Sequence, residues 1–571
     1  MGRRFQTQFG YGGGYYPALP LSGPRPLNSI IVGRNCWIRP DDAFSESWIG
    51  MSGSLASMTA NMLVPLGSDS LPGGITDGTV LVYRGDSTWF IARSGGPVYR
   101  NGVSIATAST ALQFMLNSIL FTAGLAQPSA PTLYLKSGST DKCRGTYSGK
   151  LTQVRSETGE ESNASLATNI VTANSQKLII SLNGIATPLD GKRWAYYGTD
   201  GGLSTIGPWF FRFEFNSSQL STIVDSNGVS RPNSIEFDYF DFETSSIFAP
   251  FNFSPPPAGT HLSTLGSVVS VLGSFNGAGV SPTIPGRIAW PATFTRFLNP
   301  AEPIIRVDGR PQNGWQAVFT KHSVQAILLS GDDNGPVFVR AYWPTAGIAN
   351  PSGACMIESE IFAILGDGYL ARSSGHQDPD TSFADPVRPD VKNINPATGI
   401  VGYYPKYDSS IFMDGAVAYP FMRGNYGGRA GWSTPFDLPG AVLSQTTMNG
   451  KLYVNIGGQV MTFDTGNGSS INWRCVPAFQ DEGSMLHRKS VWGWRTNAKG
   501  PVISKLYGND DLTTALETQT DSDSGDRILP QVKTNVKKLF NFTIGHEGTT
   551  GGARIHSTDA HGVVDGAFVD A

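Results

Sequence analysis

Short apolar runs that alternate with polar residues recur along this chain, joined in pairs by turns rich in glycine, asparagine and aspartate. An Asn-Gly pair between such runs, as at Asn101-Gly102, is a strong hairpin signal because both central positions of a type I′ turn need positive φ. The pattern predicts hairpins at six places: 79–92, 97–105, 322–342, 359–371, 451–464 and 489–506. Repeated this often, it constrains the chain to an all-β fold.

The length and composition narrow that class. At 571 residues the chain is too long for one compact core, which stops growing near about 250–300 residues. Charged residues make up 15%, against about 25% in an average soluble domain, while glycine (68) and proline (37) are abundant. Radial repetition buries both faces of many small sheets, so we expect a β-propeller-like array. The absence of a fixed short repeat argues against a solenoid.

One segment has a different strand spacing. It follows the Pro-containing stretch at 126–131 and carries tyrosine-bearing alternation and a polar loop at 159–165. These features favour an inserted sandwich of the immunoglobulin or fibronectin-III type.

The predicted domain plan follows from these patterns. The plan is a flexible N-terminal arm at 1–27, first blades at 28–127, the fibronectin-III-like insertion at 128–215, an extended connection at 216–262, remaining blades at 263–560 and a C-terminal tail at 561–571. Within the later blades, the Pro-, Gly- and Asp-rich stretch 373–435 is interpreted as a long loop, either an interaction arm or a plain connection.

The charge balance carries no broad signal for nucleic acid. Forty-two Lys and Arg against 45 Asp and Glu give a net charge of −3, whereas basic patches dominate the affinity of DNA-binding proteins. Any contact with DNA is therefore expected to be local, or simple passage along a surface. Neither the start of the chain nor the apolar stretches 111–126 and 262–280 has the form of a signal peptide or membrane span.

The cysteines and histidines lack the spacing of metal ligands. Cys36, Cys143, Cys355 and Cys475 lie more than a hundred residues apart without a CxxC pair, so we expect buried free thiols. The three late histidines show no HExxH or other close-paired spacing; they are His546, His556 and His561. The sequence predicts no metal site and no cofactor.

Candidate catalytic motifs also lack essential positions. Asp464 and Gly466 are similar to the Asp box of sialidases, but Trp473 falls too far from the glycine, so a blade turn before a core tryptophan is expected. The acidic run 521–526 lacks the Gly and Glu positions of an EF-hand, and Asp332 with Asp333 is expected to be a solvated turn. No nucleophile elbow, P-loop or dinucleotide fingerprint occurs. We predict no catalytic, cofactor-binding or metal residues, and a protein that is not an enzyme.

Four segments carry a resemblance to a known family. FDTGNGSSINWRCVPAFQDEGSMLHRKSVWGWRTNAKGPVISKLY (463–507), VKKLFNFTIGHEGTTGGARIHS (536–557) and NCWIRPDDAFSESWIGMSGSLA (35–56) resemble the late blade, closing strands and opening of hub or nozzle proteins in the tails of short-tailed bacteriophages. GTYSGKLTQVRSETGEESNAS (145–165) is similar to the fibronectin-III-like insertion that some of them carry. Ala43 stands where a turn glycine is common in that family.

The resemblance implies a virion structural protein of the tail, of the tail tubular or DNA-stabilisation type. Such proteins form rings, commonly hexamers, that continue the DNA channel below the portal and adaptor proteins. They hold the packaged genome until ejection and anchor fibres or a needle. The viral DNA passes through the lumen without sequence-specific binding. A neutral or slightly acidic channel wall would fit that role, since each retained Lys/Arg–phosphate contact adds affinity.

Two alternatives remain open from the residues. One is a glycan-binding or glycan-degrading propeller, which needs convergent carboxylates and exposed aromatic rings. The other is a virus fibre or capsid-decorating protein, which predicts trimers or isolated copies in place of a ring.

Overall fold

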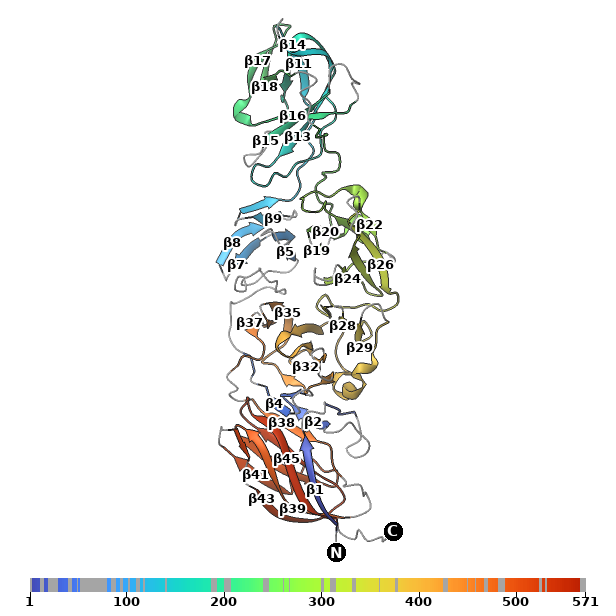
Figure 1. The fold of residues 1–571 in the computed structure, drawn as a ribbon, viewed down its shortest axis with the longest axis vertical. Coiled ribbons are helices and arrows are strands. Elements are labelled where there is room, and N and C mark those ends of the chain that lie inside the picture. The colour runs from blue at the N-terminus through green and yellow to red at the C-terminus, as the bar shows by residue number, and fades with distance from the viewer. Residues whose placement is uncertain are drawn as a thin grey trace.

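The computed structural model confirms an all-β, propeller-like fold with an inserted sandwich (Figure 1). Its sheets are small and antiparallel throughout the described part of the chain. The described residues are 3–10, 15–18, 29–39, 44–48, 50–51, 80–83, 89–92, 96–100, 103–108, 113–116, 119–138, 141–185, 193–199, 207–239, 246–259, 261–265, 267–298, 302–308, 315–330, 335–358, 360–374, 378–424, 430–448, 450–457, 459–466, 471–480, 488–522, 526–528 and 531–564.

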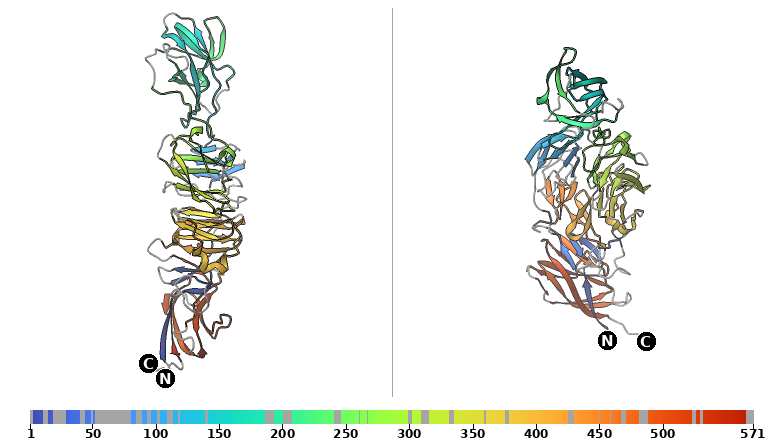
Figure 2. Two further views of the ribbon diagram at one scale, coloured as in Figure 1. Left: turned by 90° about the vertical axis from the view of Figure 1, so that its right-hand side faces the viewer. Right: turned by 45° about the horizontal axis from the view of Figure 1, so that its top comes forward.

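The molecule is elongated, and its three parts follow one another along the long axis. The inserted sandwich lies at one end, the propeller-like array in the middle, and a second sandwich with both chain termini at the other end (Figures 1 and 2). Strands from the beginning and the end of the chain therefore meet in one body.

Six small sheets form the propeller-like array in the described residues. Their first strands contact one another in chain order, β5 to β19, β23, β27, β30 and β35, and the sheets surround a common centre (Figure 1). The strands are β5 (Val80–Tyr83), β6 (Trp89–Ala92), β9 (Gln113–Leu116) and β10 (Ile119–Thr122); β19 (His261–Leu265), β20 (Val268–Gly273), β21 (Gly279–Pro282) and β22 (Arg296–Phe297); β23 (Arg306–Asp308), β24 (Trp315–Phe319), β25 (Val324–Leu329) and β26 (Val337–Trp343); β27 (Ala354–Ile357), β28 (Glu360–Ile364) and β29 (Leu370–Ser374); β30 (Ile400–Tyr404), β31 (Ser409–Asp414), β32 (Val417–Met422), β33 (Gly431–Trp432) and β34 (Phe436–Asp437); β35 (Val442–Met448), β36 (Lys451–Ile456) and β37 (Gln459–Thr462). A separate hairpin, β7 (Gly96–Arg100) and β8 (Val103–Ala108), accompanies the first sheet.

The central strands of these sheets are buried on both faces. Every residue of β24, β28 and β30 is buried. Neighbouring sheets share their cores: Phe319 of β24 and Ile361 of β28 belong to one apolar cluster, and Leu272 of β20 and Ile327 of β25 to another. Such strands read as nearly continuous apolar runs because neighbours cover both of their faces.

Five of the six predicted hairpins are confirmed by strand pairing. β5 pairs with β6, β7 with β8, β25 with β26, β28 with β29 and β36 with β37, all antiparallel. Asn101-Gly102 and Asp332-Asp333 lie outside the described residues.

The chain leaves the propeller after β10, the last strand of the first blade, and forms the inserted sandwich. It then returns to the propeller at β19, the first strand of the second blade. The core of the sandwich centres on Leu133, Ile180, Trp194 and Tyr196. The prediction ended this unit at residue 215, but β18 pairs with β14, so strands of the predicted connection 216–262 complete the sandwich. The strands are β11 (Thr132–Lys136), β12 (Cys143–Tyr147), β14 (Val171–Ser181), β17 (Ser221–Val224) and β18 (Ser230–Phe237) in one sheet, and β13 (Gly149–Val154), β15 (Arg193–Gly198) and β16 (Phe210–Phe215) in the other.

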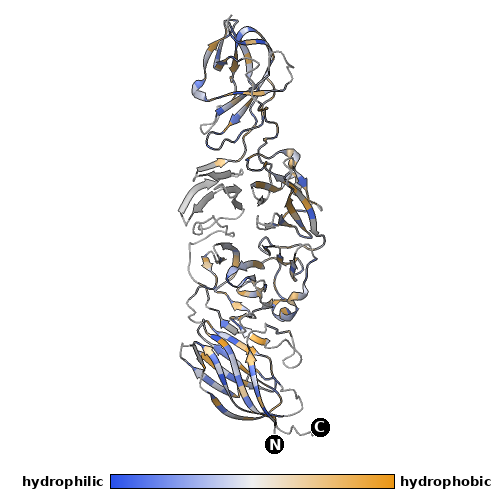
Figure 3. Cartoon of the chain, viewed as in Figure 1, coloured by the Kyte–Doolittle hydropathy of each residue, from blue (hydrophilic) through white to orange (hydrophobic). Residues whose placement is uncertain are grey.

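A second two-sheet unit, here called the terminal sandwich, joins the two ends of the chain. Hydrophilic and hydrophobic residues alternate along its strands (Figure 3). Its larger sheet holds β1 (Arg3–Gly10), β3 (Cys36–Arg39), β4 (Phe44–Ser47), β39 (Lys489–Lys499), β42 (Asp526–Ile528), β43 (Val532–Leu539) and β45 (Arg554–Val564). The other holds β2 (Ile30–Arg34), β38 (Trp473–Pro477), β40 (Val502–Gly508), β41 (Glu517–Asp521) and β44 (Phe542–Gly548).

The structure corrects three expectations at the chain ends. β39 and β40 do not form the predicted hairpin at 489–506; they lie in different sheets, with β39 pairing β45 and β40 pairing β44. β38 and the strands after it therefore belong to the terminal sandwich rather than to further blades, and so do β2 to β4, which lie within the predicted first blades at 28–127. The predicted flexible arm contains β1, whose partner β45 extends into the predicted tail at 561–571.

The predicted long loop at 373–435 is also different in the structure. Its first part is short helical turns, and its second part contributes β30 to β33 of the fifth blade. The β31–β32 hairpin turns at Gly415, which has φ of 55°, a conformation that glycine adopts without strain.

Helices are few and short in the described residues: α1 (Ser274–Gly277), α2 (Arg388–Val391), η1 (Ser217–Gln219), η3 (Ala292–Phe294), η5 (Ser382–Val387) and η6 (Pro405–Tyr407). None of the helices in the described ranges has the length and apolar character needed to cross a membrane.

Candidate functional site

Two networks of ionisable side chains connect separate units of the described structure. One lies between the fourth and fifth blades, and the other lies where the propeller meets the terminal sandwich. Both are candidate sites, because clustered carboxylates and groups with shifted pKa values are common at catalytic and binding sites.

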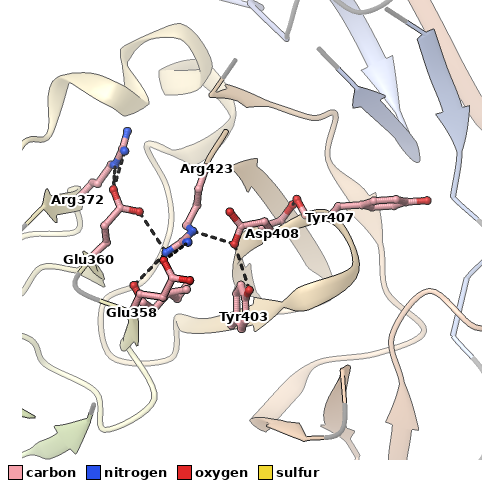
Figure 4. A network of polar contacts seen from close by, with 9 residues as sticks. Glu358, Glu360, Arg372, Tyr403, Tyr407, Asp408 and Arg423 are labelled. Carbon is pink, nitrogen blue, oxygen red and sulfur yellow. Dashed lines mark hydrogen bonds and ion pairs between the residues drawn. The ribbon is translucent and has the colours of Figure 1, made fainter. Parts of the chain in front are cut away.

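Arg423 is the centre of the first network (Figure 4). It directly follows β32, and its side chain is fully buried. Its Nε donates to Asp408 Oδ1 at 3.0 Å, Nη2 to Glu358 Oε2 at 3.0 Å and Nη1 to the Ile357 carbonyl at 2.9 Å. Its Nη1 also lies 3.3 Å from Glu360 Oε2.

Local turns of the chain bring these carboxylates to Arg423. Glu358 and Asp408 both have positive φ, 57° and 44°, and each stands at a turn before the next strand. Tyr403 Oη donates to Asp408 Oδ1 at 3.1 Å, and Arg372 Nη2 donates to Glu360 Oε1 at 2.7 Å. The network thus ties the fourth blade to the fifth.

The electrostatics of this network favour a structural role. Burial alone would lower the pKa of Arg423, but Asp408 and the other carboxylates outweigh it and raise that pKa. Asp408, Glu358 and Glu360 each contact a guanidinium group. The Glu358 and Glu360 contacts join residues of the fourth blade to residues of the fifth.

The second network surrounds Asp464, which follows β37 and is buried. Its Oδ2 accepts from Tyr404 Oη at 2.9 Å and from Lys406 Nζ at 3.2 Å. Burial raises the pKa of the Asp464 carboxyl, and Lys406 and Tyr404 only partly oppose that effect. Burial also raises the pKa of Tyr404, with the neighbouring Asp464 carboxylate adding to the shift.

This second network continues into the terminal sandwich. Tyr407 Oη donates to Glu46 Oε2 at 3.3 Å, and Arg554 Nε donates to Glu46 Oε1 at 3.1 Å. Trp37 packs beside it, with its ring centroid 4.8 Å from that of Tyr407 and 5.5 Å from that of Tyr404. Polar and aromatic contacts together fix the propeller on the terminal sandwich.

The motifs singled out in the sequence do not come together around a common point. Asp464 ends the sixth blade, whereas Trp473 begins β38 of the terminal sandwich and donates from Nε1 to the Thr550 carbonyl at 2.9 Å. The expected blade turn and core tryptophan are therefore both present, but in different units. Of the acidic run 521–526, Asp521 ends β41 and Asp526 begins β42, and the residues 523–525 are outside the described part.

The late histidines occupy different environments within one sandwich. His546 is fully buried, with Nδ1 2.9 Å from Ser504 Oγ and Nε2 2.9 Å from Thr558 Oγ1. His561 is partly exposed, and its Nε2 is 3.0 Å from Gln531 Nε2. Among the residues that the structure describes, no three His, Cys, Asp or Glu side chains are grouped so as to hold a metal ion.

The sequence reading missed Arg423 and its carboxylate partners. They fall in and beside the stretch interpreted as a loop, although the run IVGYYPKYDSSIFMDGAVAYPFM (400–422) carries an alternating pattern with Asp414-Gly415 between its apolar halves. That Asp-Gly signal could have identified the β31–β32 hairpin and placed Arg423 at the end of a buried strand.

Comparison with known proteins gives limited information. No protein-family model and no curated protein matches this chain. Solved structures with some similarity include BamB from Moraxella catarrhalis (9% identity, 70% of this chain and 92% of that one, TM-score 0.23). They also include the Dos1 propeller (12%, 68% and 93%, 0.23) and Sqt1 from Chaetomium thermophilum (11%, 60% and 98%, 0.23). Similarity at this level carries no argument about what this chain does.

Proposed function

We propose that this protein is a structural component of a bacteriophage tail and not an enzyme. In this proposal it forms a ring-shaped hub or nozzle that continues the DNA channel below the portal and adaptor proteins. It retains the packaged genome and anchors other tail parts, such as fibres or a needle. The expected assembly is a closed ring of identical subunits, six being the common number in the family that the chain resembles.

One observation carries the proposal. Three segments resemble tail hub proteins, and they come from opposite ends of this sequence: 35–56, 463–507 and 536–557. All three supply strands of the terminal sandwich. β4 and β39 both pair with β45, and β38 pairs with β44. A resemblance scattered by chance over 571 residues has no reason to converge on one folded unit.

The two polar networks agree with a structural role. In both, polar and charged side chains join one folded unit to the next, through contacts such as Arg423–Glu360 and Tyr407–Glu46. The carboxylates needed for glycan cleavage would instead have to face a substrate across a shared space.

The oligomeric mass and outline of the purified chain test the proposal. We expect rings by light scattering and negative-stain imaging, either with the chain alone or after addition of the adaptor protein of the same virion. The matched control is the chain mixed with an unrelated protein of similar charge, which should leave the mass unchanged. A stable trimer, or a monomer indifferent to the adaptor, would overturn the hub assignment. Depolymerisation of host polysaccharide by the purified chain would overturn the non-enzymatic one.

A further inference from the structure

The four cysteines are all free and buried, as the sequence predicted, but two of them are neighbours in space. Cys36 begins β3 near the start of the chain, and Cys475 lies in the middle of β38 near its end. Both side chains lie in one buried apolar cluster, and the neighbouring Cys475 adds to the burial that raises the pKa of the Cys36 thiol. Cys143 lies in the core of the inserted sandwich, and Cys355 in β27 of the fourth blade.

Strand pairing explains how residues so far apart in sequence meet. β2 runs antiparallel to β38, with Gly33 opposite Cys475 and Arg34 opposite Arg474. Asn35, with φ of 54°, then turns the chain from β2 into β3. The turn places Cys36 Sγ 3.4 Å from the Arg34 carbonyl and 3.5 Å from the Arg474 carbonyl, directly beside the residue that precedes Cys475.

This pair sits where the two ends of the chain close the molecule. Cys36 N donates to Thr434 Oγ1 at 2.7 Å, so the same residue that contacts β38 also contacts the fifth blade. The segment between Cys36 and Cys475 contains all six blade sheets and the inserted sandwich. At present only non-covalent contacts hold this closure.

We propose that Cys36 and Cys475 form a redox site, in which a peroxide-class oxidant converts the thiol pair to a disulfide that covalently closes the chain around its propeller. In the first step the sulfur of one cysteine attacks a peroxide oxygen. An S–O bond forms, the O–O bond breaks and one water leaves. The second thiol then attacks the resulting sulfenic sulfur, forming the S–S bond and releasing a second water. The two thiols lose two electrons and two protons, and the peroxide accepts them.

The surroundings set the rate of this reaction. Both side chains are buried, and burial raises the pKa of the Cys36 thiol, so the thiolate that reacts is scarce. Oxidation is therefore expected to be slow and to become faster at alkaline pH. It should favour this pair because a sulfenic acid formed at Cys36 would have the Cys475 thiol beside it. Cys143 lies in the core of the inserted sandwich, whereas Cys355 shares the apolar cluster of Cys36 and Cys475 but lies on β27 of the fourth blade.

Treatment of the full-length chain with hydrogen peroxide, followed by peptide mapping without reduction, tests the proposal. We expect the maleimide-reactive thiols counted in denaturant to fall from four to two, and one new linked peptide pair joining Cys36 to Cys475, lighter by two hydrogen atoms. The oxidised chain should also unfold at a higher urea concentration, and dithiothreitol should reverse both changes. A cross-link that closes a long loop constrains the unfolded chain most.

Matched variants separate this site from general oxidation. Cys36→Ala and Cys475→Ala should each abolish the linked peptide, while Cys143→Ala and Cys355→Ala should retain it. Should an alanine variant fail to fold, the linked peptide of the unaltered chain still decides the matter. Four thiols that persist, oxidation spread evenly over four cysteines, or loss of thiols as sulfinic acids without a linked peptide would each overturn the proposal.

Discussion

Replacing Arg423 with methionine is expected to destabilise the junction of the fourth and fifth blades by about 3–5 kcal/mol. Methionine preserves much of the side-chain length but removes the guanidinium group. The Asp408 side chain, 8% exposed, would then lose its cation while remaining buried, and Glu360, 10% exposed, would keep only its contact with Arg372. Removing one member of a buried ion pair costs far more than the pair contributes net, because the remaining charge is left without compensation.

Hydrogen exchange of the native protein measures this effect locally, in peptides covering β31 and β32, alongside urea unfolding of the whole chain. Arg388→Met is the matched control, because the Arg388–Asp385 pair is 49% and 57% exposed and should change stability by about 0–1 kcal/mol. Adding Asp408→Asn to Arg423→Met should recover part of the loss, since it removes one uncompensated charge. Equal effects of Arg423→Met and Arg388→Met would contradict the structural role of the network.

The hairpins were predictable from sequence because their signals are local. The paired runs at 322–342 and 359–371 carry both the alternation and the turn residues within twenty or so positions, and β25–β26 and β28–β29 form there. Pairing between distant strands leaves no such mark. The predicted hairpin at 489–506 has turn residues too, yet β39 and β40 lie in two different sheets, because their partners are the closing strands β45 and β44.

The N-terminal strand illustrates the same limit. In β1 the apolar residues Phe5 and Phe9 alternate with Arg4 and Gln8, but arginines and glycines around them gave the segment the composition of a flexible arm. Its order depends on pairing with β45 and on packing of Phe9 against Phe542, at a ring-centroid distance of 5.7 Å. Those partners lie more than five hundred positions away, so no local window of sequence contains them.

The candidate networks were invisible for a related reason. Arg423 meets Glu358 and Glu360 only because two blades pack side by side, and Cys36 meets Cys475 only because the chain ends close on each other. Spacing rules detect ligand or catalytic sets within one element, whereas these contacts join separate elements. The lack of a known motif in the sequence therefore does not predict which charged side chains meet in the folded chain.

His546 should make the terminal sandwich sensitive to acid. Its ring bridges the two sheets, from Ser504 of β40 in one to Thr558 of β45 in the other. Complete burial lowers the pKa of His546 from 6.5 to about 3. Above pH 6.5 the imidazole is neutral in both the folded and the unfolded chain, so its contribution does not change with pH. As the pH falls below 6.5, the unfolded chain binds a proton that the folded chain does not, and stability is lost until the folded pKa is reached.

We therefore expect His546→Gln to reduce the loss of unfolding free energy between pH 7.5 and pH 4.5 by about 2–3 kcal/mol relative to the unaltered chain. Glutamine can still donate to one hydroxyl and accept from the other, but it does not titrate. Thr496→Val is the matched control: it removes the hydroxyl 3.1 Å from Thr558 Oγ1, and should lower stability equally at both pH values. Urea unfolding of the three proteins at the two pH values gives the comparison. If His546→Gln kept the full acid-dependent loss, the proton bound on unfolding would belong to another group, and the buried imidazole would serve only to join the two sheets.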